Sequence, residues 1–270
     1  MQDYPVKLGM MLFTLVDPHR GSEVAYNRWY ERDHFYGGCM IGPGILAGSR
    51  WVATRDYKDL RFTGAGEFES PVAAPIDAGS YLATYFVQKG HEAEHFGWAT
   101  PEVFKLYEAG RGFDEREHAH TVLYSHTTAA YRDSDGVPVE LALDHRFAGL
   151  TSVHLDRAEG VSHRDLETWF EDSGRIGLLD ETSPVAIAAS WRPVIPKEGE
   201  GAAPMKLGSG PGTTQRSMQL FFSDEAPAGH WDRFHAYAEA VEASGIARVV
   251  LAAPFLPTIP GTDTYTDQLW

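Results

Sequence analysis

The sequence YNRWYERDH at residues 26–34 decides the fold of this chain. Read as a helix, it places Tyr26, Tyr30 and His34 along one stripe, because positions four residues apart lie on the same helix face. Two phenols and an imidazole on one face make a candidate site. The same stretch also begins a repeat, which sets the architecture of the whole chain.

The stretch recurs in altered form 140 residues later. A Trp-Phe-Glu triplet at residues 169–171 matches Trp29-Tyr30-Glu31, and Trp191 matches Trp51 at the same offset. The second copy loses the polar residues: Phe170 stands for Tyr30, Ser173 for Asp33 and Gly174 for His34. The pattern predicts a tandem duplication with one asymmetric site, in the first half.

Composition narrows the class of protein. The chain has 270 residues, 43% hydrophobic and 23% charged, as folded globular proteins do. A net charge of −15 without basic runs disfavours nucleic acid and anionic membranes. We therefore expect a small-molecule substrate. The N-terminus lacks a secretory pattern and Cys39 is the single cysteine, so we expect a cytoplasmic protein without disulfides.

Hydrophobic periodicity and turn signals predict the same order of elements in each half: strand, helix, strand, strand, helix, strand. The first half has expected strands at 7–16, 45–54, 81–88 and 118–131, and helices at 22–35 and 92–109. The second half has strands at 151–156, 186–194, 218–223 and 247–253, and helices at 162–173 and 231–243. Each half is a ferredoxin-like βαββαβ unit.

The halves, 1–145 and 146–270, each have a sheet with one face uncovered by helices. Packing these faces together predicts an α+β protein in which both sheets form a barrel-like interior. A Gly- and Pro-rich linker is expected at 197–214 and an extended tail at 254–270. Fusion of the halves removes the need for a homodimer but allows one.

The first-half motif resembles the dimeric α+β barrel superfamily, and most closely its EthD-like branch. The resemblance rests on Asn-Arg-Trp-Tyr followed by His34, then Pro43-Gly44 and Arg50 on the next strand. It is good over residues 7–51 and topological elsewhere. The resemblance implies two ferredoxin-like units packed as a barrel, here fused in one chain. The superfamily includes cofactor-free cyclases, isomerases and monooxygenases as well as haem enzymes, so it does not fix the reaction.

Candidate catalytic residues follow from their chemistry. His34 titrates near neutrality and suits general acid–base catalysis, and Tyr30 and His126 could stabilise a developing oxyanion. Tyr26, Trp29, Arg50 and Tyr124 complete the expected site as substrate-binding residues. The alternative for the helix residues is core packing, and for Arg50 a surface ion pair.

Two histidine patterns invite a metal or haem interpretation. Along the strand at 118–131, His118, His120, Tyr124 and His126 are expected on one face, which would allow ligation as well as hydrogen bonding. The residues 91–95 match a zinc-peptidase spacing but begin a helix, where acidic residues complement the dipole. No nucleotide-binding glycine motif is present. We predict neither a metal nor a cofactor.

The sequence thus favours a cofactor-independent lyase, isomerase or cyclase that acts on a small aromatic molecule through histidine acid–base catalysis. A haem-dependent peroxidase or dehydratase, with His120 or His126 as the axial ligand, is the first alternative. A non-catalytic protein that binds a hydrophobic metabolite is the second.

Overall fold

The computed structural model describes residues 4–66, 68–195 and 212–270. The strands of this part are β1 (Leu8–Pro18), β2 (Ile45–Val52), β3 (Tyr81–Gln88), β4 (Arg116–Tyr131), β5 (Gly149–Arg157), β6 (Val185–Pro193), β7 (Arg216–Ser223) and β8 (Ala247–Pro257). The α-helices are α1 (Glu23–Trp29), α2 (Arg55–Asp59), α3 (Glu92–Glu108), α4 (His163–Trp169) and α5 (Trp231–Ser244). Two π-helices, η1 (Tyr30–Met40) and η3 (Phe170–Gly174), continue α1 and α4.

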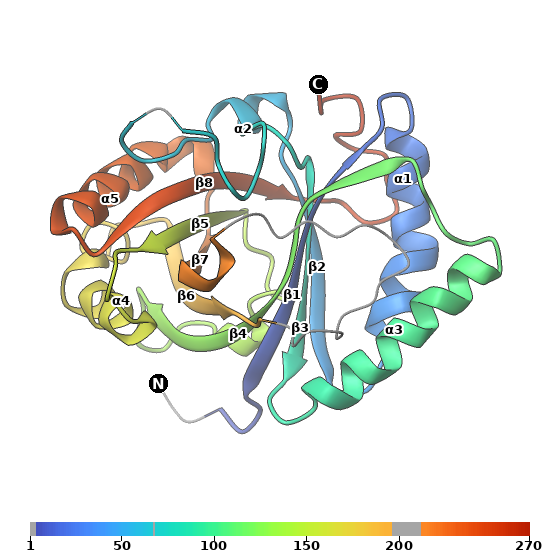
Figure 1. The fold of residues 1–270 in the computed structure, drawn as a ribbon, viewed down its shortest axis with the longest axis horizontal. Helices are drawn as coiled ribbons and strands as arrows, with labels where there is room; N and C mark the ends of the chain where they lie inside the picture. The colour runs from blue at the N-terminus through green and yellow to red at the C-terminus, as the bar shows by residue number, and fades with distance from the viewer. Residues whose placement is uncertain (1–3, 67, 196–211) are drawn as a thin grey trace.

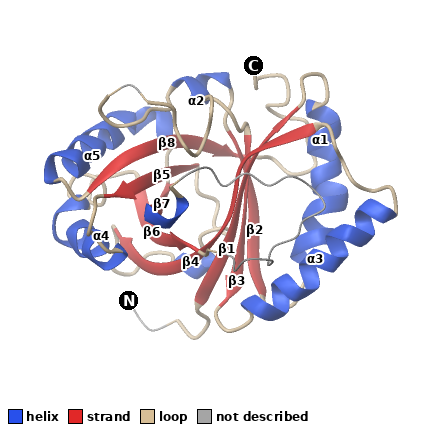
Figure 2. Ribbon diagram, viewed as in Figure 1, coloured by secondary structure: helices blue, strands red, loops and turns tan. Residues whose placement is uncertain are grey.

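The eight strands of the described residues join in one closed antiparallel barrel with the order β1-β3-β2-β8-β5-β7-β6-β4. Within each half the order is fourth, first, third, second, which is the ferredoxin-like arrangement. Figure 1 shows α1 and α3 against the sheet of the first half and α4 and α5 around that of the second, so the helices cover the barrel from outside. Figure 2 shows the same layers by element type. The predicted α+β barrel of two ferredoxin-like halves is confirmed.

The barrel interior is packed with side chains from both halves. The rings of Trp51 and Phe222 lie 6.3 Å apart and those of Phe86 and Trp191 lie 5.4 Å apart, so the two sheets meet through aromatic contacts. Each fully buried side chain of this size stabilises the fold by roughly 1.5–3 kcal/mol. A separate apolar cluster on the outer face of the first sheet contains Tyr26 and Tyr30.

The two seams between the halves differ in length. Strands β4 and β6 pair over seven residue positions, from Tyr124 opposite Pro193 to Tyr131 opposite Ile187. Strands β2 and β8 pair at only two residue positions, Trp51 opposite Pro257 and Val52 opposite Leu256. Proline has no N–H for a strand ladder, so Pro257 and the following Pro260 end the pairing. In Figure 1 β8 crosses towards β2 and approaches it at its arrowhead.

The first helix runs further than predicted. It was expected to end near Phe35 at a Gly-Gly pair, but η1 continues it to Met40. A π-helix has more residues per turn than an α-helix and brings residues five apart above each other. Trp29 and His34 stack in this way, with ring centroids 5.2 Å apart and planes at 22°.

The prediction that the alternating residues of β4 share one face is wrong for His118. On β1, the neighbours Leu15 and Val16 pair with His120 and His118, so β4 holds one extra residue. Such a bulge turns the following side chains to the opposite face. The Nδ1 atom of His118 lies 2.9 Å from Thr121 Oγ1 on the outer face, whereas His120 points into the barrel.

The connections and the tail complete the described chain. After β4, a short 3-10 helix, η2 (Val139–Leu141), lies in the connection between the halves. The tail, expected from residue 254, begins later because β8 runs to Pro257, and its end packs on α1: Leu269 is fully buried and Trp270 Nε1 donates a hydrogen bond to Glu23. The linker expected at 197–214 lies mostly outside the described residues; its end forms η4 (Thr213–Gln215), and η5 (Pro227–His230) precedes α5.

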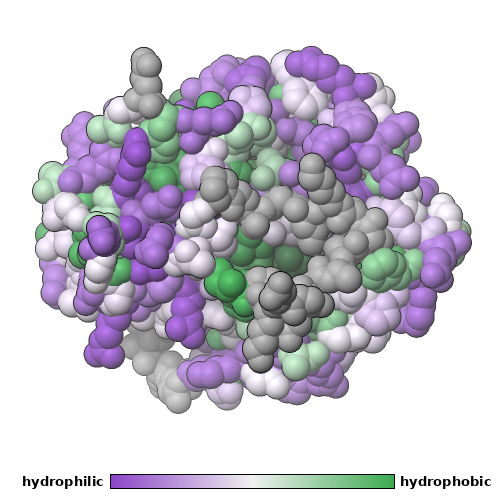
Figure 3. Space-filling model, viewed as in Figure 1, coloured by the Kyte–Doolittle hydropathy of each residue, from purple (hydrophilic) through white to green (hydrophobic). Residues whose placement is uncertain are grey.

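The surface agrees with the acidic composition. Figure 3 shows a face on which hydrophilic side chains are spread widely and apolar ones form small areas near the centre. Among the described residues, no helix combines the length and apolar character needed to cross a bilayer.

Candidate functional site

The helix stripe forms as predicted, but as a buried cluster. The ring of Tyr30 lies 5.5 Å from that of Tyr26 and 4.9 Å from that of His34. The hydroxyls of Tyr30 and Tyr85 are hydrogen-bonded at 2.8 Å. Burial raises the pKa of both Tyr26 and Tyr30 above the ordinary value, so both phenols are protonated at neutral pH. Their position fits packing between helix and sheet.

His34 is a neutral imidazole in this setting. Burial, followed by the nearby charge of Arg116, lowers its pKa to about 3. His34 stacks on Trp29 and lines none of the three cavities described below. Its predicted role as the general acid–base catalyst stays a prediction.

Arg50 links the aromatic cluster to a cavity. It lies on β2 with its side chain 4% exposed, opposite in direction to Trp51, which belongs to the barrel interior. The guanidinium carbon lies 4.5 Å from the ring centre of Tyr30 and 5.1 Å from that of Tyr81, within cation–π range. Its Nη1 donates to Asn27 Oδ1 at 2.8 Å. Arg50 is therefore held on three sides and has little freedom to move.

Glu31 is the acidic group that Arg50 holds in place. Arg50 Nη1 lies 3.2 Å from Glu31 Oε1, and the backbone N–H of Gly261 donates to Oε2 at 2.8 Å. The Glu31 side chain keeps 21% exposure, and both Glu31 and Arg50 line one cavity. Both carboxylate oxygens of Glu31 therefore accept hydrogen bonds, and the side chain borders the cavity.

This cavity, here called the seam cavity, has a volume of about 770 Å³. Its walls come from η1, from β2, from the connection at 143–148 between the halves, and from the segment at 257–261 that follows β8. Apolar side chains dominate the walls: Phe35, Tyr36, Trp51, Leu143, Phe147, Pro257, Ile259 and Pro260. The size and composition are those of a site for a small, largely apolar molecule.

The seam cavity lies where β2 lacks a strand partner. The carbonyl of Arg50 accepts hydrogen bonds from the N–H and hydroxyl of Thr258, at 3.0 and 3.1 Å, just beyond the end of β8. From there towards Ile45 the edge of β2 has no ladder partner on the β8 side among the described strands. An unpaired strand edge carries free backbone donors and acceptors, and here it borders the cavity.

His145 brings an imidazole to the seam cavity. It lies in the exposed connection between the halves, with its ring 4.4 Å from that of Phe147. Of the described residues that line the cavity, it is the one histidine. Glu31 and His145 thus stand on different walls of one cavity.

The inward-facing residues of β4 form a separate polar group inside the barrel. His120 Nε2 and Tyr124 Oη are hydrogen-bonded at 2.9 Å, and the His120 ring lies 5.5 Å from that of His154 on β5. His126 packs on Trp191 at 5.1 Å. Burial lowers the pKa of His120 to about 3 and of His126 to about 4. These imidazoles are uncharged at neutral pH.

Neither of the two predicted axial ligands, His120 and His126, is placed to hold a haem in this arrangement. His120 has its Nε2 engaged by Tyr124 and its ring enclosed by Phe13 and His154, at 6.0 and 5.5 Å. His126 has a buried Nε2 without a partner among the described residues, but it packs against an indole and lines none of the three cavities. An axial histidine needs an open plate-shaped space beside its free nitrogen.

The histidines at residues 91–95 and the carboxylate of Asp33 have ordinary hydrogen-bond and ion-pair partners. His95 Nδ1 lies 3.0 Å from the carbonyl of Pro43, and His91 pairs with Glu94 at 3.0 Å. Across the described residues, no group of three potential metal ligands forms. Asp33 does not orient an imidazole: burial raises its pKa, but hydrogen bonds from Arg32 and Arg111 outweigh this and lower it.

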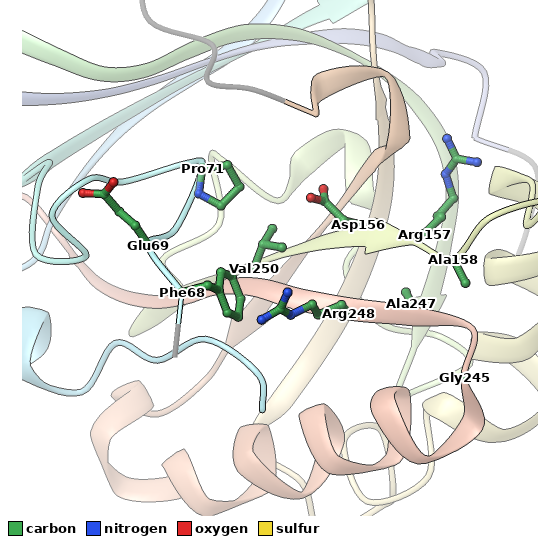
Figure 4. A pocket seen from close by; sticks show the side chains of 10 residues that line it. All are labelled: Phe68, Glu69, Pro71, Asp156, Arg157, Ala158, Gly245, Ala247, Arg248 and Val250. Atoms are coloured by element: carbon green, nitrogen blue, oxygen red, sulfur yellow. The ribbon is translucent and has the colours of Figure 1, made fainter. Parts of the chain in front are cut away.

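Two smaller cavities contain none of the predicted site residues. One, of about 500 Å³, is lined by Asp156, Arg248 and Phe68 among others. Figure 4 shows Arg248 beside Phe68, and the guanidinium lies 3.3 Å from the ring centre. Asp156 is paired with the buried Arg216 at 2.9 Å. The other, of about 330 Å³, lies between η3 and α5. The seam cavity is larger than either and contains Arg50, one of the predicted site residues.

Comparison with known proteins supports the fold. No protein-family model and no curated protein matches the sequence. A putative chlorite dismutase is 9% identical with a TM-score of 0.53, covering 98% of this chain and 100% of that one. An anthrone oxidase-like protein is 10% identical with a TM-score of 0.50, covering 96% and 98%. A heme-binding protein from Thermus thermophilus is 7% identical with a TM-score of 0.44, covering 98% and 96%.

At such identities the first two likenesses establish the dimeric α+β barrel fold and leave the chemistry to the residues of this chain. The duplication and the EthD-like branch stay predictions. Among the residues described above that line the seam cavity, the sequence analysis singled out Arg50 but not Glu31 or His145. Glu31 lies within residues 26–34, but a glutamate between Tyr30 and Arg32 is typical of an exposed helix position. Pro257 and Pro260 were the sequence features that could have predicted the short pairing between β2 and β8.

Proposed function

We propose that this chain is a cofactor-independent enzyme that moves a proton on a small aromatic molecule bound in the seam cavity, as an isomerase, cyclase or lyase. Glu31 is the base and His145 the second proton carrier. Arg50 is a positioning residue, because its guanidinium holds the Glu31 carboxylate and is itself enclosed by tyrosines. The observation that carries the proposal is the Glu31 carboxylate, fixed by Arg50 and the Gly261 N–H and facing an aromatic-walled cavity of about 770 Å³.

The mechanism follows from the positions of these groups. Aromatic walls such as Trp51 and Phe147 favour a planar ring. Glu31 accepts a proton from the bound molecule, and Arg50 keeps the carboxylate oriented in both protonation states. His145, on the connection between the halves, returns a proton at another atom. General acid–base catalysis of this kind contributes about 10²–10⁴-fold.

The test uses exchange of carbon-bound hydrogen, because the substrate class is defined by an acidic proton. A panel of aromatic ketones, phenols and lactams is incubated with the protein in D₂O, and deuterium uptake is followed by proton NMR. We expect one or more members to exchange, and Glu31→Gln to slow exchange by at least about 10²-fold. His34→Ala is the matched comparison: exchange that survives Glu31→Gln but is lost in His34→Ala would return the base to the helix stripe.

A haem protein is the second candidate, favoured by the name of the putative chlorite dismutase with which the fold is shared. The packing of His120 and His126 opposes it. The decisive measurement is a visible absorption spectrum of protein produced with a haem precursor supplied. A stoichiometric Soret band that is lost in His126→Ala would replace the proton-transfer proposal. The non-catalytic binding alternative predicts ligand binding in the seam cavity with no exchange in any member of the panel.

A further inference from the structure

The backbone of Gly48 gives the seam cavity a donor and an acceptor side by side. Along a strand, the N–H and C=O of one residue point to the same side, and residues two apart share that side. The N–H of Ala53, just after β2, donates to the carbonyl of Ser80, just before β3, so alternate residues of β2 direct their backbone groups towards β3. The Arg50 carbonyl accepts from Thr258 on the β8 side. Gly48, two residues before Arg50, therefore directs both backbone groups towards the β8 side.

No strand of the described chain meets Gly48 there. The ladder between β2 and β8 covers Trp51 and Val52 alone, because the chain leaves the barrel at Pro257. Within the described residues, no hydrogen bond from another segment reaches the Gly48 backbone on this side. Gly48 lines the seam cavity. Its N–H and C=O are thus placed to pair with a bound molecule.

Because Gly48 has no side chain, η1 can pack closely against β2 at this position. A Cβ at Gly48 would lie 2.4 Å from Met40 Sδ and 3.0 Å from Phe35 Cζ, on the η1 side of the strand. Glycine therefore lets η1 pack directly on β2 while the backbone edge faces the cavity. The cavity volume of about 770 Å³ suits a small molecule rather than an extended peptide.

From these observations we infer that the seam cavity recognises a planar ring with an adjacent N–H donor and C=O acceptor, a lactam or cyclic imide. The lactam carbonyl accepts from the Gly48 N–H, and the lactam N–H donates to the Gly48 carbonyl. This pairing reuses the hydrogen-bonding pattern by which extended ligands add to sheet edges. The inference rests on the proposed function for its cavity, and it names the substrate class for that site.

The test is calorimetric titration with 2-quinolone and with N-methyl-2-quinolone, which has the same ring and carbonyl but no donor. Loss of one hydrogen bond, with the Gly48 carbonyl left unpaired, is worth roughly 1–3 kcal/mol, so we expect the methylated probe to bind about 5- to 150-fold more weakly. Ala148→Trp, which fills the cavity from the connection, should abolish binding of 2-quinolone. Circular dichroism confirms that this variant folds.

The outcomes separate the two proposals. Equal binding of both probes, or binding that persists in Ala148→Trp, overturns the Gly48 inference. Failure of 2-quinolone to bind at millimolar concentration also overturns it. Neither result touches the proton-transfer proposal, which stands or falls with the deuterium exchange of the wider panel and its loss in Glu31→Gln. Selective binding of 2-quinolone together with no exchange would support the inference and reject catalysis by Glu31.

Discussion

Replacing Tyr30 with phenylalanine tests whether the helix stripe is held by its buried hydroxyls. Tyr30 and Tyr85 are 3% and 1% exposed, and their hydroxyls are hydrogen-bonded at 2.8 Å. A typical buried hydrogen bond contributes about 1 kcal/mol net, and an orphaned partner adds a desolvation cost of about 1–3 kcal/mol. Tyr85 also approaches the thiol of Cys39, which relieves part of that cost. We expect Tyr30→Phe to lower the free energy of unfolding by about 1–2 kcal/mol.

The measurement is urea unfolding followed by circular dichroism, with linear extrapolation to water. Tyr85→Phe is measured alongside, and so is the double variant. Because the two hydroxyls share one bond, the double variant should lose less than the sum of the single losses, with a coupling energy of about 1 kcal/mol. Tyr36→Phe is the control, since Tyr36 is 59% exposed and should change stability by less than about 0.5 kcal/mol. Additive losses would refute the argument.

The remaining predictions concern pH, the tail and the strand edge. Burial lowers the pKa of His154 well below its ordinary value, so the unfolded state binds a proton first and stability falls as pH drops below about 6.5. His154→Phe should therefore reduce the pH dependence of the free energy of unfolding between pH 6.5 and 5, by up to about 1.4 kcal/mol per pH unit, as measured by urea unfolding. Asp263→Asn removes the exposed pair with Arg28 and should speed amide exchange in the tail while costing less than about 1 kcal/mol globally. Gly48→Ala should cost about 1–3 kcal/mol by denaturation, and Met40→Ala in the same chain should recover part of it.

The strands and helices could be predicted from sequence because their signals are local. Residues 81–88 were predicted as a strand and form β3 with the same bounds, since every residue from Tyr81 to Val87 is apolar or small and the run is bounded by loops. The paired tryptophans and the repeated order of elements then led to the barrel. Burial of one sheet face against the other is required whenever helices cover the outer faces.

Features that depend on tertiary geometry were missed. The π-helical continuation to Met40 arises from packing on β2 and α3, and it has no distinct composition. The bulge beside His120 reverses the face of His118, and strand alternation alone cannot place a bulge. The role assigned to Glu31 depends on contacts with Gly261, which is 230 positions away in the chain. Such long-range contacts leave no periodic signal.

The asymmetry of the seams offers a physical reason for a site in one half. Strand β4 has 16 residues and stays paired along β6, where Ser190 lies opposite Thr128. Ser190 is the counterpart of Arg50, so in the second seam this position is sealed by a neighbouring strand. Strand β8 has 11 residues and turns away after Pro257, which leaves the equivalent edge beside Arg50 open. On this reasoning, strand length and proline placement explain why the edge of β2 borders a cavity while the corresponding edge of β6 is covered by β4.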